Sequence, residues 1–443
     1  MKRRSERRPE RRTEAALYPV CGERHLFHDG CVTNRAGIVT QVSAPTILPA
    51  VEPAPRGSRP RTRRPLLGRS PALDGLRGFA LIWVVTYHFT SSAGPLKGGW
   101  VGLDVFFVLS GFLITAMLLD EIRVHGRVSL PKFYARRALR LLPALFVMLG
   151  IWVCVLLAFS ETTWIAATPG GNGVGEPVDI GAALRQVGIV LMYGVNWMYA
   201  LDGGDAPLAH LWSLAVEEQF YVVWPFVLLL LVKVVPASRR IWPVLALAAV
   251  SAALPWVYWD GGAGNDRIYF GTDTRAVGML MGAVAAFAWH RRRSSGTGSP
   301  AATARAHLGF GLVLVFLLTV GNSPLKFLAG PAIMAVAAMQ VVPYLVDRPG
   351  SWLARFHAAP VLVWLGQRSY AVYLWHYLFA TWLNPLSPWV SIPVGVTLSL
   401  LAAHLSWRFV EAPALRYSKR FRPGLSAVAP TPAPAARPER LAA

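Results

Sequence analysis

Ten apolar segments of similar length run through this sequence. Each is close to the roughly 20 residues that an α-helix needs to cross a bilayer. They are centred on residues 75–92, 101–120, 139–159, 212–233, 241–259, 271–290, 306–321, 326–346, 365–384 and 391–410. The mean hydropathy of +0.41 and the charged content of only 15% agree with a polytopic membrane protein rather than a soluble enzyme. We therefore expect an all-α integral membrane protein with about ten transmembrane helices.

A further apolar segment, residues 183–200, is shorter than the others and carries Arg185, Gln186 and Asn196. If it crossed the membrane, the connections rich in Lys and Arg would be divided between the two sides. If it does not cross, they all fall on the side of the N-terminus, as the positive-inside rule requires of cytoplasmic loops. We therefore expect a multi-pass plasma-membrane protein with both termini cytoplasmic, in which this segment is re-entrant or interfacial and shielded from lipid.

The two ends of the chain differ in composition from the apolar region. Residues 1–70 are rich in Arg and Pro and are predicted to be a disordered, basic cytoplasmic arm. Residues 71–415 would form the transmembrane domain, and residues 416–443, rich in Ala and Pro, a disordered cytoplasmic tail. The cations cluster in the arm and between apolar runs, so the net charge of +21 indicates a lipid bilayer as partner and no nucleic acid.

One group in the arm has the residue types of a metal site. Cys21, His25, His28 and Cys31 could hold zinc by type and number, but their separations are short and no hydrophobic segment surrounds them. We expect no metal, and the three cysteines give no disulfide framework.

The first apolar segment carries both a cation and a titratable ring. His88 follows Arg77 by eleven positions. That spacing is about three helical turns, so the two side chains share a face and lie roughly 16 Å apart along the axis. Ionisable residues are costly inside a bilayer and usually face a protein interior or a wet cavity. A snorkelling Arg and an interfacial His are the structural alternative, but a lined path through the bundle is favoured.

Further polar residues are expected in the outer half of the bundle. Asp104 lies near the outer end of the second span, with Ser110 deeper in the same helix. Glu217 and Glu218 are adjacent at the outer entry of a later span, where Ser213 precedes Glu217 by one helical turn. Two carboxylates at such depth indicate a function. His210, Tyr269 and Arg275 are further candidates at the outer ends of spans, and Tyr373 and His376 share one helical stripe in a later span.

A cationic cluster marks the inner mouth of the third span. It consists of Arg136, Arg137 and Arg140, and the first and last of these are neighbours on a helix. Positive-inside anchoring explains many such clusters. Guanidinium groups also match phosphate oxygens in bidentate geometry, so a phosphate clamp is the functional alternative. The pattern predicts anion binding in the inner half and proton handling in the outer half.

Several motifs resemble the membrane-bound acyltransferase-3 family, in which ten residues separate an Arg or Lys from a His. The first is LDGLRGFALIWVVTYH, and it is followed in order by GGWVGLDVFFVLSGFLIT, FYARRALRLLP, HLWSLAVEEQFY, SYAVYLWH and SWRFVEAP. The resemblance runs from about residue 72 to residue 415. The positions it identifies as functional are Arg77, His88, Asp104, Arg136, Arg137 and Glu217.

This resemblance implies a ten-helix membrane enzyme that O-acylates, mostly O-acetylates, sugars and other molecules of the cell envelope. Acyl-coenzyme A is the usual donor in the family. We therefore expect no permanently bound cofactor and acyl-CoA, most often acetyl-CoA, as co-substrate. Many relatives carry an additional esterase-like domain; because this sequence ends soon after Pro413, we expect none here.

The expected reaction moves an acyl group to a hydroxyl of a sugar in an envelope polysaccharide or glycolipid. The guanidinium groups of Arg136, Arg137 and Arg140 would hold the coenzyme phosphates, with Arg77 beside the pantetheine path. His88 would take the proton from the acceptor hydroxyl, because an imidazole titrates near neutral pH.

Other groups are expected to support this base. Glu217 or Asp104 would fix the tautomer of His88, as a carboxylate does in hydrolytic triads. Arg275 or a tyrosine hydroxyl would stabilise the oxyanion. Whether a covalent acyl-enzyme forms stays open, and His88 or Ser213 would be its nucleophile.

Two other functions are compatible with these residues. A proton-coupled transporter without acyl chemistry would also bury ionisable side chains in a helical bundle. Transporters often show internal repeats, however, and neither the Arg–His block nor the Glu–Glu block recurs in the second half of the sequence. The third interpretation is an O-acyltransferase that tailors a macrolide or another secondary metabolite. Release of coenzyme A thiol would separate the enzymes from the transporter.

Overall fold

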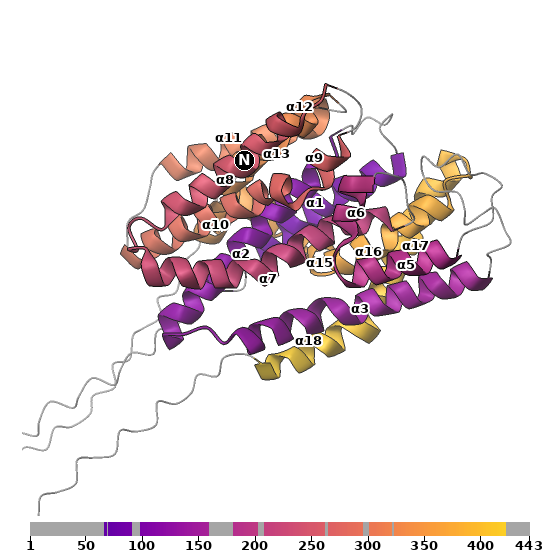
Figure 1. Ribbon diagram of the computed structural model, residues 1–443, viewed down its shortest axis with the longest axis horizontal. Helices are drawn as coiled ribbons and strands as arrows, with labels where there is room; N and C mark the ends of the chain where they lie inside the picture. The colour runs from indigo at the N-terminus through magenta and orange to yellow at the C-terminus, as the bar shows by residue number, and fades with distance from the viewer. Residues whose placement is uncertain are drawn as a thin grey trace, which may run out of the picture. The chain divides into compact units, whose positions relative to one another are not determined.

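The computed structural model of the protein describes residues 66–68, 70–90, 98–158, 180–202, 208–261, 265–295, 301–320 and 323–421. Within these ranges every regular element is helical and no strand occurs (Figure 1). The all-α membrane architecture expected from the sequence is confirmed. The predicted arm before residue 66, its Cys21–Cys31 group, the connection 159–179 and residues 422–443 lie outside the described residues.

The helices of the first half are α1 (Pro71–Thr90), α2 (Val101–His125), α3 (Leu130–Ala158), α5 (Ile180–Leu191), α6 (Val195–Asp202), η1 (Ala209–Leu211) and α7 (Trp212–Val234). Those that follow are α8 (Ile241–Tyr258), α9 (Asp266–Phe270), α10 (Thr272–Ser295), α11 (Ala301–Thr319), α12 (Leu325–Leu328), α13 (Gly330–Asp347) and α14 (Trp352–His357). The last are α15 (Pro360–Gln367), α16 (Ser369–Trp382), α17 (Pro388–Ser406), η2 (Trp407–Glu411), α18 (Ala412–Ser418) and η3 (Lys419–Phe421).

Seven helical segments of the described chain are long and apolar enough to cross a membrane. They are α2, α3, η1 with α7, α8, α11, α13 and the run from α17 to η3. The helices of the other three predicted spans fall outside this group. Charged residues lie within α1 and α10, and the predicted span 365–384 is divided between α15 and α16 at Arg368. A total of ten spans therefore stays a prediction.

The segment 183–200 folds into two short helices, α5 and α6, which a turn at Tyr193 connects. Tyr193 has a positive φ of 53°. The Gln219 side chain of α7 meets this turn: its Nε2 donates to the backbone atom Tyr193 O over 2.6 Å and to the side-chain atom Asn196 Oδ1 over 2.8 Å. Non-helical backbone is tolerated at membrane depth only where protein or water satisfies it, so these bonds fit the predicted re-entrant or interfacial segment.

Backbone contact between α2 and α10 determines how the site is assembled. A Cβ at Gly111 would lie 1.9 Å from Met279 O, and one at Gly282 would lie 2.1 Å from Val108 O. Only glycine permits so close an approach, which is a common way for membrane helices to pack. The contact holds the N-terminal turns of the two helices, with their charged side chains, face to face.

The C-terminal end of the described chain corrects one expectation. The predicted disordered tail begins at residue 416, but the helical run continues through α18 and η3 to Phe421 and packs beside α3 (Figure 1). Arg136 Nη1 donates to Phe421 O over 2.8 Å. This contact ties the last described turn to α3, a constraint that the composition of the tail does not reveal.

Candidate functional site

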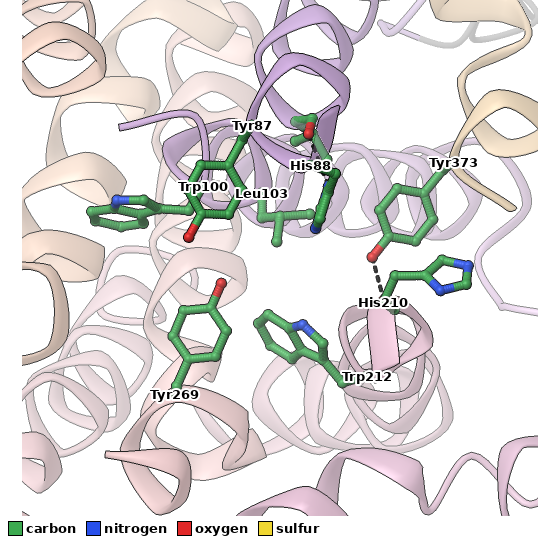
Figure 2. A pocket seen from close by; sticks show the side chains of 9 residues that line it. Tyr87, His88, Trp100, Leu103, His210, Trp212, Tyr269 and Tyr373 are labelled. Carbon is green, nitrogen blue, oxygen red and sulfur yellow. Dashed lines mark hydrogen bonds between the residues drawn. The ribbon is translucent and has the colours of Figure 1, made fainter. Parts of the chain in front are cut away.

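A cavity with about 280 Å³ of empty volume lies beside the C-terminal turns of α1 (Figure 2). Helices α1, α7, α9 and α16, the turn η1 and the start of α2 contribute its wall. The lining residues are Val84, Tyr87, His88, Trp100, Leu103, His210, Trp212, Tyr269 and Tyr373. Aromatic rings thus form most of the wall and imidazoles the most basic part of it.

The His88 ring projects from α1 into this cavity, toward the space that Leu103, Trp212 and Tyr373 surround (Figure 2). Its Nδ1 atom lies 2.9 Å from Val84 O and 3.1 Å from His376 Nε2. Within the described chain no hydrogen-bond partner meets the other ring nitrogen, Nε2. That atom is therefore the one available to a ligand.

Two hydrogen bonds hold the Tyr373 hydroxyl beside the turn η1. The hydroxyl donates to the His210 carbonyl, which can only accept (Figure 2). Ser213 Oγ, 2.6 Å away, must then be the donor to the Tyr373 oxygen. The only hydroxyl proton of Tyr373 is therefore committed. His210 is itself 2% exposed, and its Nε2 lies 3.3 Å from Leu374 O.

Tyr87 and Tyr269 line the opposite wall, and their hydroxyl groups point toward one another across the cavity (Figure 2). Neither hydroxyl forms a hydrogen bond with the described residues. Burial raises the pKa of the Tyr269 phenol well above its ordinary value, so this group stays protonated at neutral pH. Both side chains can therefore donate to a ligand oxygen.

Two cations lie behind this tyrosine wall. Arg275 pairs with Asp104 at 3.3 Å, and its guanidinium carbon is 5.1 Å from the centre of the Tyr269 ring. Lys326, from the short helix α12, places Nζ 5.2 Å from the same ring and 5.8 Å from that of Tyr87. Burial, with a smaller effect of Arg275, lowers the pKa of Lys326 to about 8. Because Asp104 offsets the charge of Arg275, Lys326 is the cation that contributes positive charge to this side of the cavity.

Glu217 and Glu218 belong to a polar cluster that does not line the cavity. Ser110 Oγ donates to Glu217 Oε1 over 3.1 Å, and the Tyr221 hydroxyl donates to Glu217 Oε2 over 3.4 Å. Arg137 Nη2 donates to Glu218 Oε1 over 2.8 Å, with its guanidinium carbon 3.3 Å from the centre of the Tyr221 ring. The cluster joins α2, α3 and α7 through charges that satisfy one another.

The structure brings neither predicted carboxylate to His88. Asp104 pairs with Arg275, and Glu217 accepts from Ser110 and Tyr221. The group that contacts the His88 ring nitrogen is another imidazole, that of His376. The orientation of His88 therefore rests on a residue that the sequence marked only as a supporting one.

Two arginines of the predicted phosphate clamp are bound by different protein partners. Arg136 pairs with Glu121 at 3.4 Å and donates to Phe421 O, and Arg137 pairs with Glu218 at 2.8 Å. Both guanidinium groups are thus engaged by protein acceptors, which favours a structural contribution for these two residues.

Arg77 and Arg140 form the open part of the cationic end. Arg140 is exposed and forms no hydrogen bond or ion pair with the described residues, although it interacts electrostatically with Arg77, with Arg137 and with the Glu411 carboxylate. Arg77 pairs with the Asp74 carboxylate at 3.6 Å and also interacts electrostatically with Glu217. Because Arg77 and His88 stand three turns apart on α1, this cationic end and the cavity are the two ends of one helix face.

Several residues of the cavity escaped the sequence analysis. Tyr87, Trp100 and Trp212 line it, and Lys326 lies behind it. The available signal was aromatic residues at the ends of predicted spans. Such residues are enriched at every membrane interface, so the signal does not separate a cavity wall from an ordinary interfacial belt.

The fold is that of an all-α membrane protein, and its site places imidazoles in an aromatic cavity, as a membrane-embedded transferase of the family below requires. The sequence matches the family described as "Acyltransferase domain" over residues 70–408, which is more than half of the chain. The chain therefore belongs to the acyltransferase-3 family, as its motifs indicated.

Two curated relatives illustrate the family. The chain is 32% identical to the peptidoglycan O-acetyltransferase OatA of Listeria monocytogenes over 363 residues, which are 77% of this chain and 55% of that protein. It is also 32% identical to the protein named "Putative peptidoglycan O-acetyltransferase YrhL" of Bacillus subtilis, over 77% of this chain and 54% of that protein. The chain thus spans about half the length of the curated relatives it matches. No solved structure matches it.

Proposed function

We propose that the protein is an O-acetyltransferase that moves an acetyl group from acetyl-CoA to a sugar hydroxyl of a cell-wall glycan in the plasma membrane. Membership of the acyltransferase-3 family supports the acyl transfer, and relatives named for peptidoglycan O-acetylation support the glycan. The aromatic lining of the cavity fits this class of acceptor, because rings offer flat apolar faces to sugar C–H groups.

The observation that carries this proposal is the His88 ring in the cavity, with Nδ1 engaged and Nε2 facing the open space. In this position Nε2 accepts the proton of the acceptor hydroxyl as its oxygen attacks the thioester carbonyl. The carbon–sulfur bond then breaks, and the proton passes from Nε2 to the leaving thiolate. The products are an O-acetyl ester and free coenzyme A thiol. A positioned base typically contributes about 10²–10⁴-fold to the rate.

The carbonyl oxygen becomes negatively charged during this attack. The Tyr87 and Tyr269 hydroxyls would donate to it, since both are uncommitted, whereas Tyr373 has no proton to offer. Lys326 lies behind Tyr269 and favours negative charge at this place, whereas Asp104 offsets the charge of Arg275.

The donor would enter from the other end of α1, which we place at the cytoplasmic side. Arg140 offers an exposed guanidinium group there and Arg77 one that is 18% exposed, and such groups bind phosphate oxygens bidentately. The acyl-pantetheine arm would then follow the α1 face toward His88.

The test uses purified protein in liposomes, with acetyl-CoA and soluble peptidoglycan fragments. Thiol release and a gain of one acetyl mass on the glycan are the expected readouts. His88→Ala should abolish both while leaving expression and membrane insertion unchanged. Wild-type rates in that variant would remove His88 as the base, and thiol release without a glycan product would remove the acceptor class.

A further inference from the structure

The contacts of the His376 ring determine which of its nitrogen atoms carries hydrogen. Its Nδ1 lies 2.8 Å from Tyr373 O and 3.2 Å from Val372 O. Carbonyl oxygens only accept, so Nδ1 is the protonated nitrogen. The side chain is 0% exposed and no carboxylate contacts it within the described chain, so a charged ring would be uncompensated there. His376 is therefore neutral, and its Nε2 atom is an acceptor.

This acceptor decides the protonation of the neighbouring ring. His376 Nε2 is 3.1 Å from His88 Nδ1, so the hydrogen between them belongs to His88. The second neighbour of that nitrogen, Val84 O at 2.9 Å, is also an acceptor. Two independent contacts thus require the same Nδ1–H form of His88, and a neutral imidazole in that form has its lone pair on Nε2.

We propose that His376 is a positioning residue that holds His88 in the Nδ1–H tautomer and so makes Nε2 the base that meets the acceptor hydroxyl. This inference rests on the proposed function of the site. It assigns to an imidazole on α16 the task that a carboxylate performs in hydrolytic triads.

The hydrogen bond between His88 and His376 also stabilises the protonated His88 ring that forms during the reaction. After His88 Nε2 takes the proton of the acceptor, the ring carries a positive charge and keeps its Nδ1–H bond to His376. The neutral His376 acceptor stabilises that charge without adding a second charge to the cavity. When Nε2 returns its proton to the leaving sulfur, both rings regain their first state, so the cycle needs no further proton donor.

His376 is fixed well enough for this task. Its ring centre is 5.0 Å from that of His88 and 5.4 Å from that of Tyr373. The bonds of Nδ1 to the backbone of its own helix prevent a flip of the ring, because a flip would leave Nδ1–H without an acceptor.

The test compares two substitutions that differ in one hydrogen-bond acceptor. In His376→Gln the amide oxygen can accept from His88 Nδ1, whereas His376→Leu has no acceptor. We expect H376L to lower kcat by about 10²-fold, less than the roughly 10⁴-fold caused by a wrong tautomer in a protease triad, since Val84 O remains. H376Q should retain most of kcat, and neither substitution should change KM for acetyl-CoA. His357→Leu is the control for the general cost of losing a buried imidazole. His357 lies fully buried on α14 and has a similar backbone bond.

A spectroscopic measurement separates positioning from packing. Solid-state ¹⁵N NMR of histidine-labelled protein in liposomes reports which ring nitrogen is protonated, and a difference from H88Q isolates the His88 signals. We expect protonated Nδ1 and unprotonated Nε2 in the wild type and in H376Q, and a mixture of tautomers in H376L. Should H376L fail to insert, H376N replaces it, because its shorter amide reaches Tyr373 O but not His88.

Three outcomes overturn the proposal: wild-type kcat in H376L, a slow H376L that keeps the single Nδ1–H tautomer, or Nε2–H in the wild-type protein. The two kcat outcomes also assume that His88 is the base, whereas the NMR readout of the tautomer is independent of that role. If H88A transferred acetyl groups at the wild-type rate while H376L shifted the tautomer, the proposed function of His88 would fail and the orientation by His376 would stand.

Discussion

Asp104 Oδ1 lies 3.3 Å from Arg275 Nη2, in an ion pair whose two side chains are each 2% exposed. The pair connects α2 to α10 near the close backbone contact at Gly111. It borders the cavity, because the Arg275 guanidinium also lies against the Tyr269 ring. The net stability of a buried pair is often small, but the loss of one partner leaves an uncompensated charge and costs about 3–5 kcal/mol.

The first prediction concerns this pair. Arg275→Met should lower the thermal unfolding midpoint strongly, because Asp104 then stays buried without a partner. The double variant Asp104→Asn with Arg275→Met should recover most of that loss, since no charge remains. Tryptophan fluorescence of the purified protein in detergent would follow unfolding. A double variant as unstable as the single one would show that the pair is not what holds the two helices.

The second prediction separates the arginines of the cationic end. Arg140→Ala should raise KM for acetyl-CoA by about 10-fold or more, because a charge-assisted hydrogen bond is worth about 1.5–3 kcal/mol. KM for the glycan should not change. Arg140→Lys should give a KM for acetyl-CoA between those of the wild type and of Arg140→Ala. Arg136→Ala is the matched control, since Glu121 and Phe421 O engage that guanidinium. Equal increases of KM in both variants would mean that the cluster acts only through its total charge.

The sequence predicted the helical fold and the shared face of Arg77 and His88, because both depend on local regularities. A run of apolar residues predicts a spanning helix, and a spacing of eleven positions predicts two side chains on one face. What it could not predict is how each helix is rotated against its neighbours. Glu217 therefore looked like a partner for His88, yet its helix turns it toward Ser110 and Tyr221.

The cationic side of the cavity shows the same limit. Lys326 stands at the start of a predicted span, where a lysine is an ordinary interfacial anchor. The short helix α12 directs the Lys326 side chain inward, where it lies among the rings of Tyr87, Trp100 and Tyr269. Contacts between residues this distant in sequence follow from the packing of the whole bundle, and a local pattern does not encode them.

The third prediction concerns the hydroxyl groups of the cavity. Tyr269→Phe should lower kcat by about 10²–10³-fold, the usual effect of removing one oxyanion donor, and Tyr87→Phe should have a similar effect. Tyr373→Phe should lower kcat much less, because its proton is committed to the His210 carbonyl. Steady-state kinetics of thiol release would measure all three. A larger effect for Tyr373→Phe than for Tyr269→Phe would reassign the donor to the η1 side of the cavity.

The last prediction uses the lowered pKa of Lys326, which is about 8 in the folded protein against an ordinary value of 10.5. Below pH 8 the ammonium is charged in both states, so its burial opposes folding fully. Between pH 8 and pH 10.5 the unfolded chain binds more protons than the folded one, and the free energy of unfolding contributed by this group rises with pH. Lys326→Met keeps the apolar stem but not the titration. The variant should therefore exceed the wild type in unfolding midpoint at pH 7, and the difference should shrink as the pH approaches 10. A difference that stays constant over this range would mean that Lys326 is not desolvated in the folded protein.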